Sequence, residues 1–492
     1  MNPDLDLGLH ALRDAYRARG LTVRQVIEEV LARIAEAGDN KVWISRPTDT
    51  ALHARADALD ARHGEIESLP LYGVPFAVKD NIDVEGLPTT AACPGFAYTP
   101  ARSAEVVQRL VDAGAIVIGK TNLDQFATGL VGVRSPYGTP RNPFDAAYVP
   151  GGSSSGSAVA VSAGLASFSL GTDTAGSGRV PAGFNNIVGL KPTPGVLSTD
   201  GVVPACKSLD CVSVFALSCA DASAVFNVAQ DDGAAGRVGG AFRFGIPTPI
   251  EFFGDKAYAA LYDAAVKKLE AMGGTAVAFD YAPFREAALL LYSGPWVAER
   301  TAAVGDFIEK ADDKAGIWPV TRQIVLGGRK YTAVDAFEGQ YKLADLRRRA
   351  AAEMKALDFL VLPTAGTIYT KADLEREPVL YNSNLGHYTN FVNFFRLSAL
   401  ALPAGFRPDG LPFGITLVGH HGQDRTLLQF GGRWQREVPL PLGRTRSRLP
   451  AQEAGPGAVE DRVSLAVVGA HMSGLPLNHQ LTQIGGRLEA VS

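Results

Sequence analysis

Apolar residues near the start of the chain recur at the spacing of an α-helix. They keep to one face at the following positions: Val23, Val26, Ile27, Val30, Leu31 and Ile34. Thr22 and Gln25 stand three residues apart at the start of this run, which is the pattern of a capping box. We therefore expect a helix that begins after Thr22.

Short apolar runs alternate with further helical segments along the rest of the chain. Residues 71–78 predict a buried strand with Lys79 at its end, and residues 115–118 predict another strand, after a helix that Ser103 caps and Gly114 ends. The same order returns with a helix at about 255–272 before a strand at 275–279, and with a helix at 344–357 before a strand at 359–362. This alternation predicts an α/β fold in which helices cover both faces of a sheet.

Composition and length fit a globular protein. The 492 residues are 46% hydrophobic and 20% charged, which excludes a chain that is disordered, collagen-like or coiled-coil as a whole. This length suggests about three domains, although one large α/β unit with a small appendage fits equally well. Residues 450–458 are small, polar and proline-bearing, as in a linker, and residues 464–469 beyond them start a strand-like segment.

Charge, cysteines and apolar runs narrow the possible classes of function. Lys and Arg number 47 against 51 Asp and Glu, a net charge of −4, so nothing indicates a nucleic-acid partner. The four cysteines are too few for a disulfide scaffold and match no zinc spacing, so we expect plain buried thiols at Cys93, Cys206, Cys211 and Cys219. The amino terminus has no apolar signal segment, and the longest apolar stretch, residues 158–170, is too short to span a bilayer. We expect a soluble, cytoplasmic protein.

The densest unusual stretch is rich in glycine and serine. Residues 151–157 read Gly-Gly-Ser-Ser-Ser-Gly-Ser, and residues 171–178 read Gly-Thr-Asp-Thr-Ala-Gly-Ser-Gly. A flexible linker would not be flanked by apolar, core-like segments, and no Gly-Lys-Ser/Thr closes the run as a phosphate loop requires. The remaining interpretation is a tight loop in which backbone N–H groups converge around hydroxyls, as in an oxyanion hole beside a nucleophile.

A serine nucleophile needs a base, and histidine fits poorly here. None of the eight histidines lies between His63 and His387, although a distant histidine remains possible because the members of a triad need not be close in sequence. Lys79 follows an apolar run, and burial lowers the pKa of a lysine so that it can act as a neutral base. A lone lysine is ordinarily a surface charge, so this interpretation depends on the glycine- and serine-rich loops being its partners.

These motifs resemble those of the amidase signature hydrolases. That family carries Gly-Gly-Ser-Ser-Gly-Gly-Ser, then Gly-Thr-Asp-Thr-Gly-Gly-Ser, with Val-Lys-Asp-Asn upstream, and all three occur here in the same order. The resemblance implies Ser177 as nucleophile, Ser153 as a bridging serine on a cis peptide, and Lys79 as base. It implies an oxyanion hole from the backbone N–H groups of Thr174, Ala175, Gly176 and Ser177, with Asp173 and Arg179 bracing the loop. Two small residues depart from the pattern, because Ser155 and Ala175 each replace a glycine.

Four further segments resemble the allophanate hydrolase branch of this family: residues 88–98, 124–132, 174–179 and 388–393. The branch carries a substrate-binding tyrosine and arginine eight residues apart on a helix, and Tyr292 and Arg300 match that spacing. A buried guanidinium can grip a carboxylate bidentately, which suits Arg300 to an anionic substrate. The resemblance also implies that Gly129, inside the second segment, contacts the substrate.

The resemblance implies a mixed, twisted sheet covered by helices on both faces, and hydrolysis of allophanate to ammonia and an N-carboxycarbamate. No metal or cofactor is required by that chemistry. It further implies a homodimer and a functional link to a biotin-dependent urea carboxylase, with no nucleic-acid or membrane partner. We expect the amidase domain at residues 1–448, a linker at 449–460, and at 461–492 the incomplete start of a C-terminal domain that lacks a core of its own.

Three alternatives remain open at this point. The chain could be another amidase of the family, such as a carboxybiuret hydrolase or a broad amide hydrolase. It could be the amidase-like subunit of the glutamine-dependent tRNA amidotransferase, which would need a partner and glutamine. A non-catalytic binding relative is the third, and the intact set of Lys79, Ser153 and Ser177 argues against it.

Overall fold

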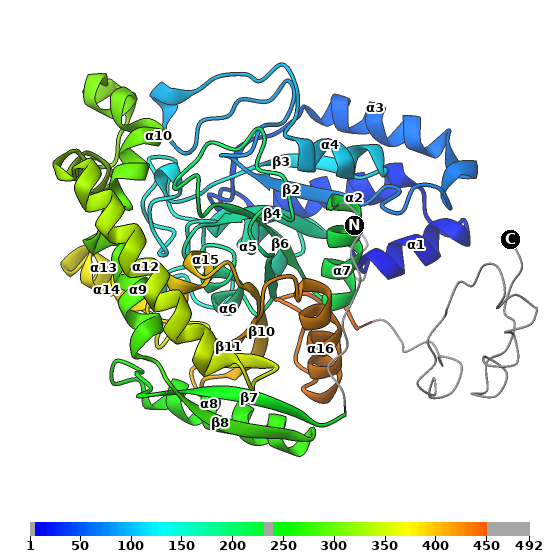
Figure 1. The fold of residues 1–492 in the computed structure, drawn as a ribbon. Helices are drawn as coiled ribbons and strands as arrows, with labels where there is room; N and C mark the ends of the chain where they lie inside the picture. Colours follow the sequence, from blue (N-terminus) through cyan, green and yellow to red (C-terminus); the bar gives the residue numbers. More distant parts are fainter. Residues whose placement is uncertain (1–4, 231–239, 450–492) are drawn as a thin grey trace, which may run out of the picture. The chain divides into compact units, whose positions relative to one another are not determined.

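The computed structural model describes residues 5–230 and 240–449. Its centre is a mixed sheet of eleven strands within those residues, in the order β1-β3-β2-β4-β6-β5-β10-β11-β9-β7-β8 (Figure 1). The strands are β1 Trp43–Ser45, β2 Pro75–Lys79, β3 Ile116–Thr121, β4 Phe168–Asp173, β5 Val188–Lys191, β6 Cys211–Ala216, β7 Phe242–Thr248, β8 Gly274–Asp280, β9 Phe359–Pro363, β10 Ser398–Phe406 and β11 Pro412–Gly419. The α/β class predicted from the sequence is confirmed.

Helices flank this sheet on both faces (Figure 1). They are α1 Leu9–Arg17, α2 Val23–Ala37, α3 Asp49–Asp60, α4 Glu105–Asp112, α5 Ser155–Ser162, α6 Val180–Phe184, α7 Cys219–Ala229, α8 Lys256–Ala271, α9 Ala282–Ser293, α10 Val297–Lys310, α11 Pro319–Leu326, α12 Ala333–Met354, α13 Lys371–Arg376, α14 Leu380–Leu385, α15 Phe391–Phe394 and α16 Asp424–Glu437. Among the described residues, no helix combines the length and the apolar character that a membrane crossing needs.

The middle of the sheet forms the core because its strands are covered on both faces. Every residue of β2, β4, β5, β6, β9 and β11 is buried. Phe76 of β2 stacks on Phe168 of β4 with ring centroids 4.9 Å apart, which ties these two strands together. Continuous apolar strands of this kind are typical of a sheet buried on both sides.

The direction of the strands decides where the polar loops meet. Strand β2 runs parallel to both β3 and β4, so the carboxyl ends of these strands lie at one edge of the sheet. Strand β6 runs antiparallel to β4, and its first residue, Cys211, pairs with the last residue of β4, Asp173. The end of β2, the end of β4 and the start of β6 therefore meet at the same edge.

Most predicted elements are present with shifted ends. Helix α2 begins after Thr22 with the predicted capping box, and α8 and β8 match the predicted segments to within one residue at each end. Strand β2 starts at Pro75 instead of residue 71, because residues 71–74 form a turn in which the N–H of Val74 donates to the carbonyl of Leu71. Helix α12 starts at Ala333, eleven residues before the predicted start, 344.

The predicted cap at Ser103 is wrong. Helix α4 begins after Ala104, and no described side chain caps its amino terminus. The Ser103 hydroxyl instead accepts a hydrogen bond from the backbone N–H of Glu85 at 3.0 Å, so a loop distant in sequence has taken the oxygen that a cap would use. The predicted linker and tail lie, from residue 450 onward, outside the described residues.

Candidate active site

Lys79 is the last residue of β2, and its ammonium group lies inside the protein. The side chain is 0% exposed. Its Nζ donates to Ser153 Oγ at 2.7 Å and to Thr172 Oγ1, near the end of β4, also at 2.7 Å. The structure thus brings the predicted base and the predicted bridging serine into direct contact. Thr172 completes this contact, and no prediction from the sequence had indicated it as a partner of Lys79.

Burial lowers the pKa of Lys79 to about 7, because removal from water penalises the charged ammonium. The carboxylates of Asp124, Asp173 and Asp210 oppose this shift only in part. A lysine with a pKa near 7 is about half neutral at physiological pH, and only the neutral amine can accept a proton. The environment of Lys79 therefore suits a general base.

The loop before α5 holds Ser153 against this lysine. The Gly152–Ser153 peptide bond is cis. The next residue fastens the loop to β4, because Ser154 Oγ donates to the carbonyl of Thr172 at 3.1 Å and accepts from its N–H at 3.3 Å. Residues 151–157 are all buried, so this glycine- and serine-rich run is a packed loop, as predicted, and its last residues also begin helix α5, which was not predicted.

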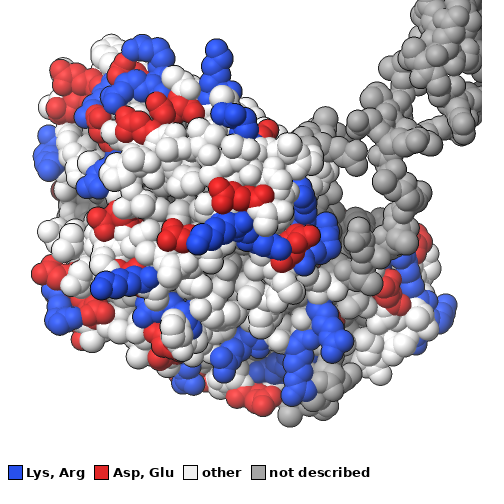
Figure 2. Space-filling view, turned by 90° about the horizontal axis from the view of Figure 1, so that it is seen from below, with Lys and Arg blue, Asp and Glu red and all other residues white. Residues whose placement is uncertain are grey.

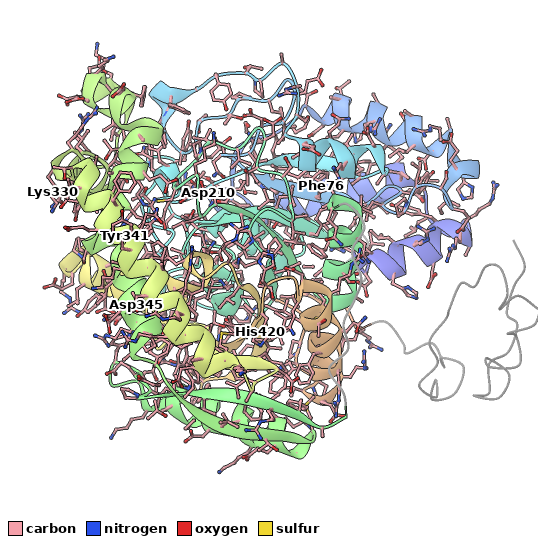
Figure 3. All side chains as sticks on the ribbon, in the orientation of Figure 1. Phe76, Asp210, Lys330, Tyr341, Asp345 and His420 are labelled. Carbon is pink, nitrogen blue, oxygen red and sulfur yellow. The ribbon has the colours of Figure 1, made fainter. Side chains whose placement is uncertain are left out.

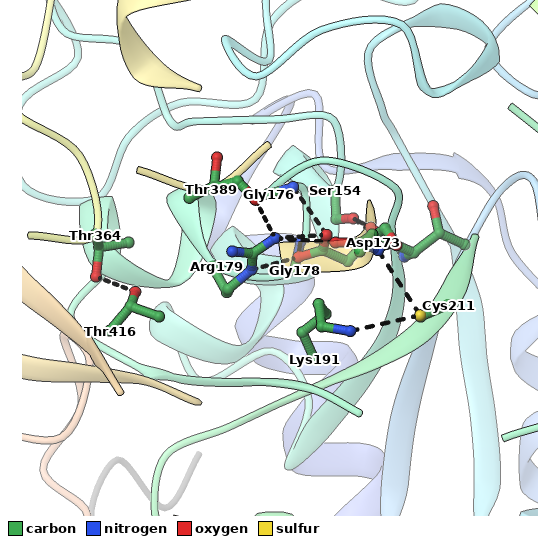
Figure 4. Close-up of polar contacts among 12 residues, drawn as sticks. Ser154, Asp173, Gly176, Gly178, Arg179, Lys191, Cys211, Thr364, Thr389 and Thr416 are labelled. Carbon is green, nitrogen blue, oxygen red and sulfur yellow. Dashed lines mark hydrogen bonds and ion pairs between the residues drawn. The ribbon is translucent and has the colours of Figure 1, made fainter. Parts of the chain in front are cut away.

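The predicted nucleophile, Ser177, lies in the turn after β4, and Asp173 organises that turn. The Asp173 carboxylate accepts the N–H groups of Gly176 and Gly178 at 2.8 and 3.0 Å. It also accepts two hydrogen bonds from the Arg179 guanidinium, at 2.9 and 3.0 Å (Figure 4). Burial would raise the pKa of Asp173, but the Arg179 guanidinium, together with Lys191 and the N–H of Gly178, outweighs burial and lowers it. This bidentate pair braces the turn.

Three of the four predicted oxyanion donors are available in this conformation. The N–H of Gly176 already donates to Asp173. The N–H groups of Thr174, Ala175 and Ser177 make no hydrogen bond with any described residue, nor does the Ser177 hydroxyl. Because an oxyanion hole needs unoccupied donors, these three N–H groups are the stronger candidates.

A second layer supports the Asp173–Arg179 pair. Arg179 Nη2 donates to the carbonyl of Thr389 at 3.1 Å, and Asn393 Nδ2 donates to the carbonyl of Asp173 at 2.8 Å. Nearby, the Nζ of Lys191 lies 3.7 Å from the sulfur of Cys211 (Figure 4). The segment 388–393, which the sequence had indicated, thus stabilises the turn through hydrogen bonds to Arg179 and Asp173.

Tyr292 and Arg300 do not share one helix, contrary to the expectation from the resemblance. Tyr292 lies in the last turn of α9 and Arg300 in the first turns of α10, with a break between Ser293 and Val297. The break still leaves them in contact: Arg300 Nη2 lies 3.5 Å from the Tyr292 hydroxyl, and the guanidinium lies over the ring at 5.3 Å. Pro295 within the break cannot supply the N–H that a continuous helix requires.

Arg300 is buried yet incompletely bonded. Its side chain is 2% exposed, and its Nη1 donates to Thr128 Oγ1 at 3.1 Å. Its Nε has no hydrogen-bond partner among the described residues. Burial would lower the pKa of Arg300, but the acidic groups around it, Tyr292 first, raise it, so the guanidinium stays charged. A buried cation with a free N–H is suited to bind an anion.

The segment 124–132 connects the two halves of the site. The N–H of Asp124 donates to the carbonyl of Ser153 at 3.0 Å, while Thr128 touches Arg300. Gly129, the predicted substrate contact, follows Thr128, and a Cβ atom there would lie 2.6 Å from Asp124 Oδ2. Only glycine fits this position, because the backbone passes close to the Asp124 carboxylate.

The described residues contain no group of three or more His, Cys, Asp or Glu side chains that could hold a metal ion. The four cysteines are free and buried, as expected from their number and spacing. Among the histidines of the described residues, His387 is half-buried against Tyr281 and Phe253, and burial lowers its pKa to about 4.

The chain is similar to several characterised proteins. The sequence profile of the amidase family matches residues 25–428. Urea amidolyase from Saccharomyces cerevisiae is 44% identical over 482 residues, which cover 94% of this chain and 26% of that protein. The solved structure of allophanate hydrolase from Kluyveromyces lactis has a TM-score of 0.84 at 44% identity, covering 94% of this chain and 79% of that one. A glutamyl-tRNA(Gln) amidotransferase subunit from Symbiobacterium thermophilum is 36% identical, covering 86% of this chain and 95% of that protein.

The chain spans about a quarter of the length of the urea amidolyases that it matches. Within the matched part, the family profile encloses Lys79, Ser153, Ser177, Tyr292 and Arg300. The solved allophanate hydrolase also shares the mixed sheet flanked by helices. The chain belongs to the amidase signature family.

Proposed function

We propose that this protein hydrolyses allophanate, urea-1-carboxylate, at its terminal amide C–N bond. The observation that carries the proposal is the contact of the buried Lys79 with Ser153 at 2.7 Å, beside the turn that holds Ser177. The similarity to an allophanate hydrolase and to urea amidolyases, at 44% identity, supports the choice of substrate. Arg300, buried and charged, supports a substrate that carries a carboxylate.

In the proposed reaction, neutral Lys79 accepts a proton from Ser153, which accepts one from Ser177. The Ser177 oxygen attacks the terminal carbonyl carbon of allophanate, and the free N–H groups of the turn stabilise the oxyanion, a contribution of about 3 kcal/mol for each donor. The C–N bond breaks and ammonia leaves with the proton that Lys79 held. Water then attacks the acyl-enzyme and releases an N-carboxycarbamate, which decomposes to ammonia and carbon dioxide.

The carboxylate of allophanate would bind at the other half of the site. Arg300 offers its Nε and Tyr292 offers its hydroxyl, and Gly129 follows Thr128, whose hydroxyl contacts Arg300. A bidentate guanidinium–carboxylate contact fixes the direction of the substrate as well as its charge. Holding the carboxylate in this way would place the terminal amide at the Ser177 turn.

Two alternatives keep some support. The 36% identity to a tRNA amidotransferase subunit favours, as a second candidate, the release of ammonia from glutamine in a complex. Another amide hydrolase, such as one acting on carboxybiuret, would use the same three residues. These candidates separate by substrate: glutamine, carboxybiuret and allophanate each release ammonia that can be measured.

The proposed setting of this activity follows the resemblance. We expect a cytoplasmic homodimer that acts after a biotin-dependent urea carboxylase, and the name of the urea amidolyases supports such a link. On the face seen in Figure 2, acidic and basic side chains are interspersed among uncharged residues, which fits a small-molecule substrate better than a nucleic acid. Sedimentation velocity would test the dimer.

The decisive experiment measures ammonia release from allophanate by the parent protein and by Ser177→Ala. We expect the parent to be active and Ser177→Ala to fall to the uncatalysed background, with an unchanged unfolding temperature. Arg300→Ala should raise KM for allophanate while it spares any turnover of a neutral amide. A parent that is inactive on allophanate but active on glutamine would replace this proposal with the second candidate.

A further inference from the structure

The two halves of the site are joined by a short segment that no motif suggested. Residues 203–210, here called the strap, precede β6 and pass between the nucleophile turn and α10. The strap begins beside the base, because the N–H of Val203 donates to the carbonyl of Asn81 at 2.8 Å, two residues after Lys79. Asn81 Nδ2 in turn lies 3.4 Å from the carbonyl of Val203.

The end of the strap is fixed to the nucleophile turn by Asp210. Its carboxylate accepts a hydrogen bond from the hydroxyl of Thr174 at 2.5 Å. It also accepts the N–H groups of Ala205 and Cys206, at 2.9 and 3.2 Å, so the same carboxylate folds the strap back on itself. Asp210, labelled in Figure 3, is half-buried at this position. The sheet makes this contact possible, because Asp173 and Cys211 are paired across β4 and β6, and Thr174 and Asp210 are their outward neighbours.

The middle of the strap is fixed to the helix that carries Arg300. The N–H of Ser208 donates to Glu299 Oε1 at 2.6 Å, and the Ser208 hydroxyl donates to Glu299 Oε2 at 2.7 Å. Glu299 immediately precedes Arg300 in α10. Cys206 Sγ adds a weak bond to the carbonyl of Trp296, at the start of the same helix. Hydrogen bonds to a carboxylate are about twice as strong as neutral ones, so the Glu299 contact is the main attachment to α10.

We propose that the strap fixes the position of Arg300 relative to the Ser177 turn, and that Asp210, Ser208 and Glu299 are positioning residues of the reaction. The inference rests on the proposed function, since it assumes that Arg300 binds the carboxylate of the substrate. A substrate held at one end by Arg300 reacts only if its amide also lies at the nucleophile, and a guanidinium that is free to move binds this pose more weakly, which raises KM. One continuous segment bonded to both parts holds that distance.

The two attachments predict different kinetic effects. Glu299→Ala releases α10 from the strap, and we expect KM for allophanate to rise about 5- to 10-fold with kcat changed less than 2-fold. Ser208→Ala removes one of the two bonds and should raise KM by about 2- to 3-fold. Lys207→Ala is the matched control, because Lys207 lies in the strap, is exposed and makes no side-chain hydrogen bond or ion pair with another described residue.

Thr174→Val removes the hydroxyl that Asp210 holds, and we expect kcat to fall about 10- to 100-fold with KM nearly unchanged. Thr174→Ser restores the hydroxyl and should restore kcat, which a loss of folding could not explain. Unfolding temperatures are measured for every variant. The proposed role of the strap is refuted if Arg300→Ala raises KM but Glu299→Ala does not. It is also refuted if Glu299→Ala and Thr174→Val change kcat and KM in the same way. An Arg300→Ala variant with unchanged KM would instead overturn the proposed carboxylate site, and the strap with it.

Discussion

At the scale of single residues, the site depends on which groups stabilise the charge of a buried lysine. Lys79 and Lys120 make the comparison, since both side chains are 0% exposed. Burial lowers the pKa of Lys120 as well, but the Asp80 carboxylate at 3.4 Å forms an ion pair that opposes this shift and favours the charged ammonium. Lys79 instead has two hydroxyls, of Ser153 and Thr172. Hydroxyls can accept from an ammonium but also donate to a neutral amine, so Lys79 is better suited than Lys120 to change protonation.

The pH dependence of catalysis should report this difference. Because the pKa of Lys79 is lowered to about 7, the amine is neutral above that pH and protonated below it. We expect kcat/KM to be constant above about pH 8 and to fall about tenfold per unit below pH 7. The measurement is ammonia release between about pH 5.5 and 9, with Ser177→Ala run in parallel to subtract the breakdown of allophanate itself. A profile that stays flat through pH 7 would contradict the role of Lys79 as base.

The residues that carry out the proposed reaction could be predicted from the sequence. The residues that hold them in place could not. The motifs that contain Lys79, Ser153 and Ser177 have a composition that is rare in protein sequences, so they can be recognised. Their partners are ordinary residues made important by the fold. Thr172 stands inside a motif, which was the one signal that could have found it. Glu299 gave no signal, because its bonds to Ser208 cross 91 positions of sequence.

At the scale of elements, the turn after β4 is shaped by a position that only glycine tolerates. Gly176 has a φ of +132°, and a Cβ atom built there would lie 2.4 Å from Thr389 Oγ1. This residue also donates its N–H to Asp173. The family pattern has two glycines here; Ala175 replaces the first, and the positive φ and the close approach to Thr389 fall on the second, Gly176.

Gly176→Ala should therefore damage catalysis more than folding. We expect a loss of about 2 kcal/mol in the free energy of unfolding from the strained φ and the contact with Thr389. The turn must shift to relieve that contact, so kcat should fall about 100-fold or more as the N–H donors move. Denaturant unfolding and steady-state kinetics check the two parts. Gly327→Ala, with nothing within 4 Å of its added Cβ and a negative φ, is the control.

The ends of two helices, α12 and α4, differ from those that the hydrophobic pattern predicted. The predicted start of helix α12 lies eleven residues too late, because the first turns carry exposed apolar side chains, including Phe337 and Tyr341, which blur the one-sided pattern. Its capping box of Thr332 and Asp335 was a usable signal. The Ser103 cap failed for the opposite reason: the local signal was present, and a contact with Glu85 outweighed it.

At the scale of the whole molecule, one sheet assembles a site from distant segments. The parallel pairing of β2 with β4 brings Lys79 beside Thr172, and the antiparallel pairing of β4 with β6 brings Thr174 beside Asp210. The alternation of helices and strands predicted the class of fold, but it could not predict the strand order. Register across a sheet is decided by packing between segments far apart in sequence, which no local pattern encodes.

Every residue of the proposed site lies within residues 79–300, and the chain up to Leu449 forms one compact unit. A variant ending at Leu449 should therefore keep kcat/KM for allophanate within about twofold. Its unfolding temperature should stay within about 2 °C of the parent, since a change of 1 kcal/mol in a large domain corresponds to roughly 2–4 °C. Kinetics and calorimetry of the two chains test this together. If the shortened chain folds with the same unfolding temperature but loses the first ammonia, residues beyond 449 contribute to the reaction, and the site as built from Lys79, Ser153, Ser177 and Arg300 is incomplete.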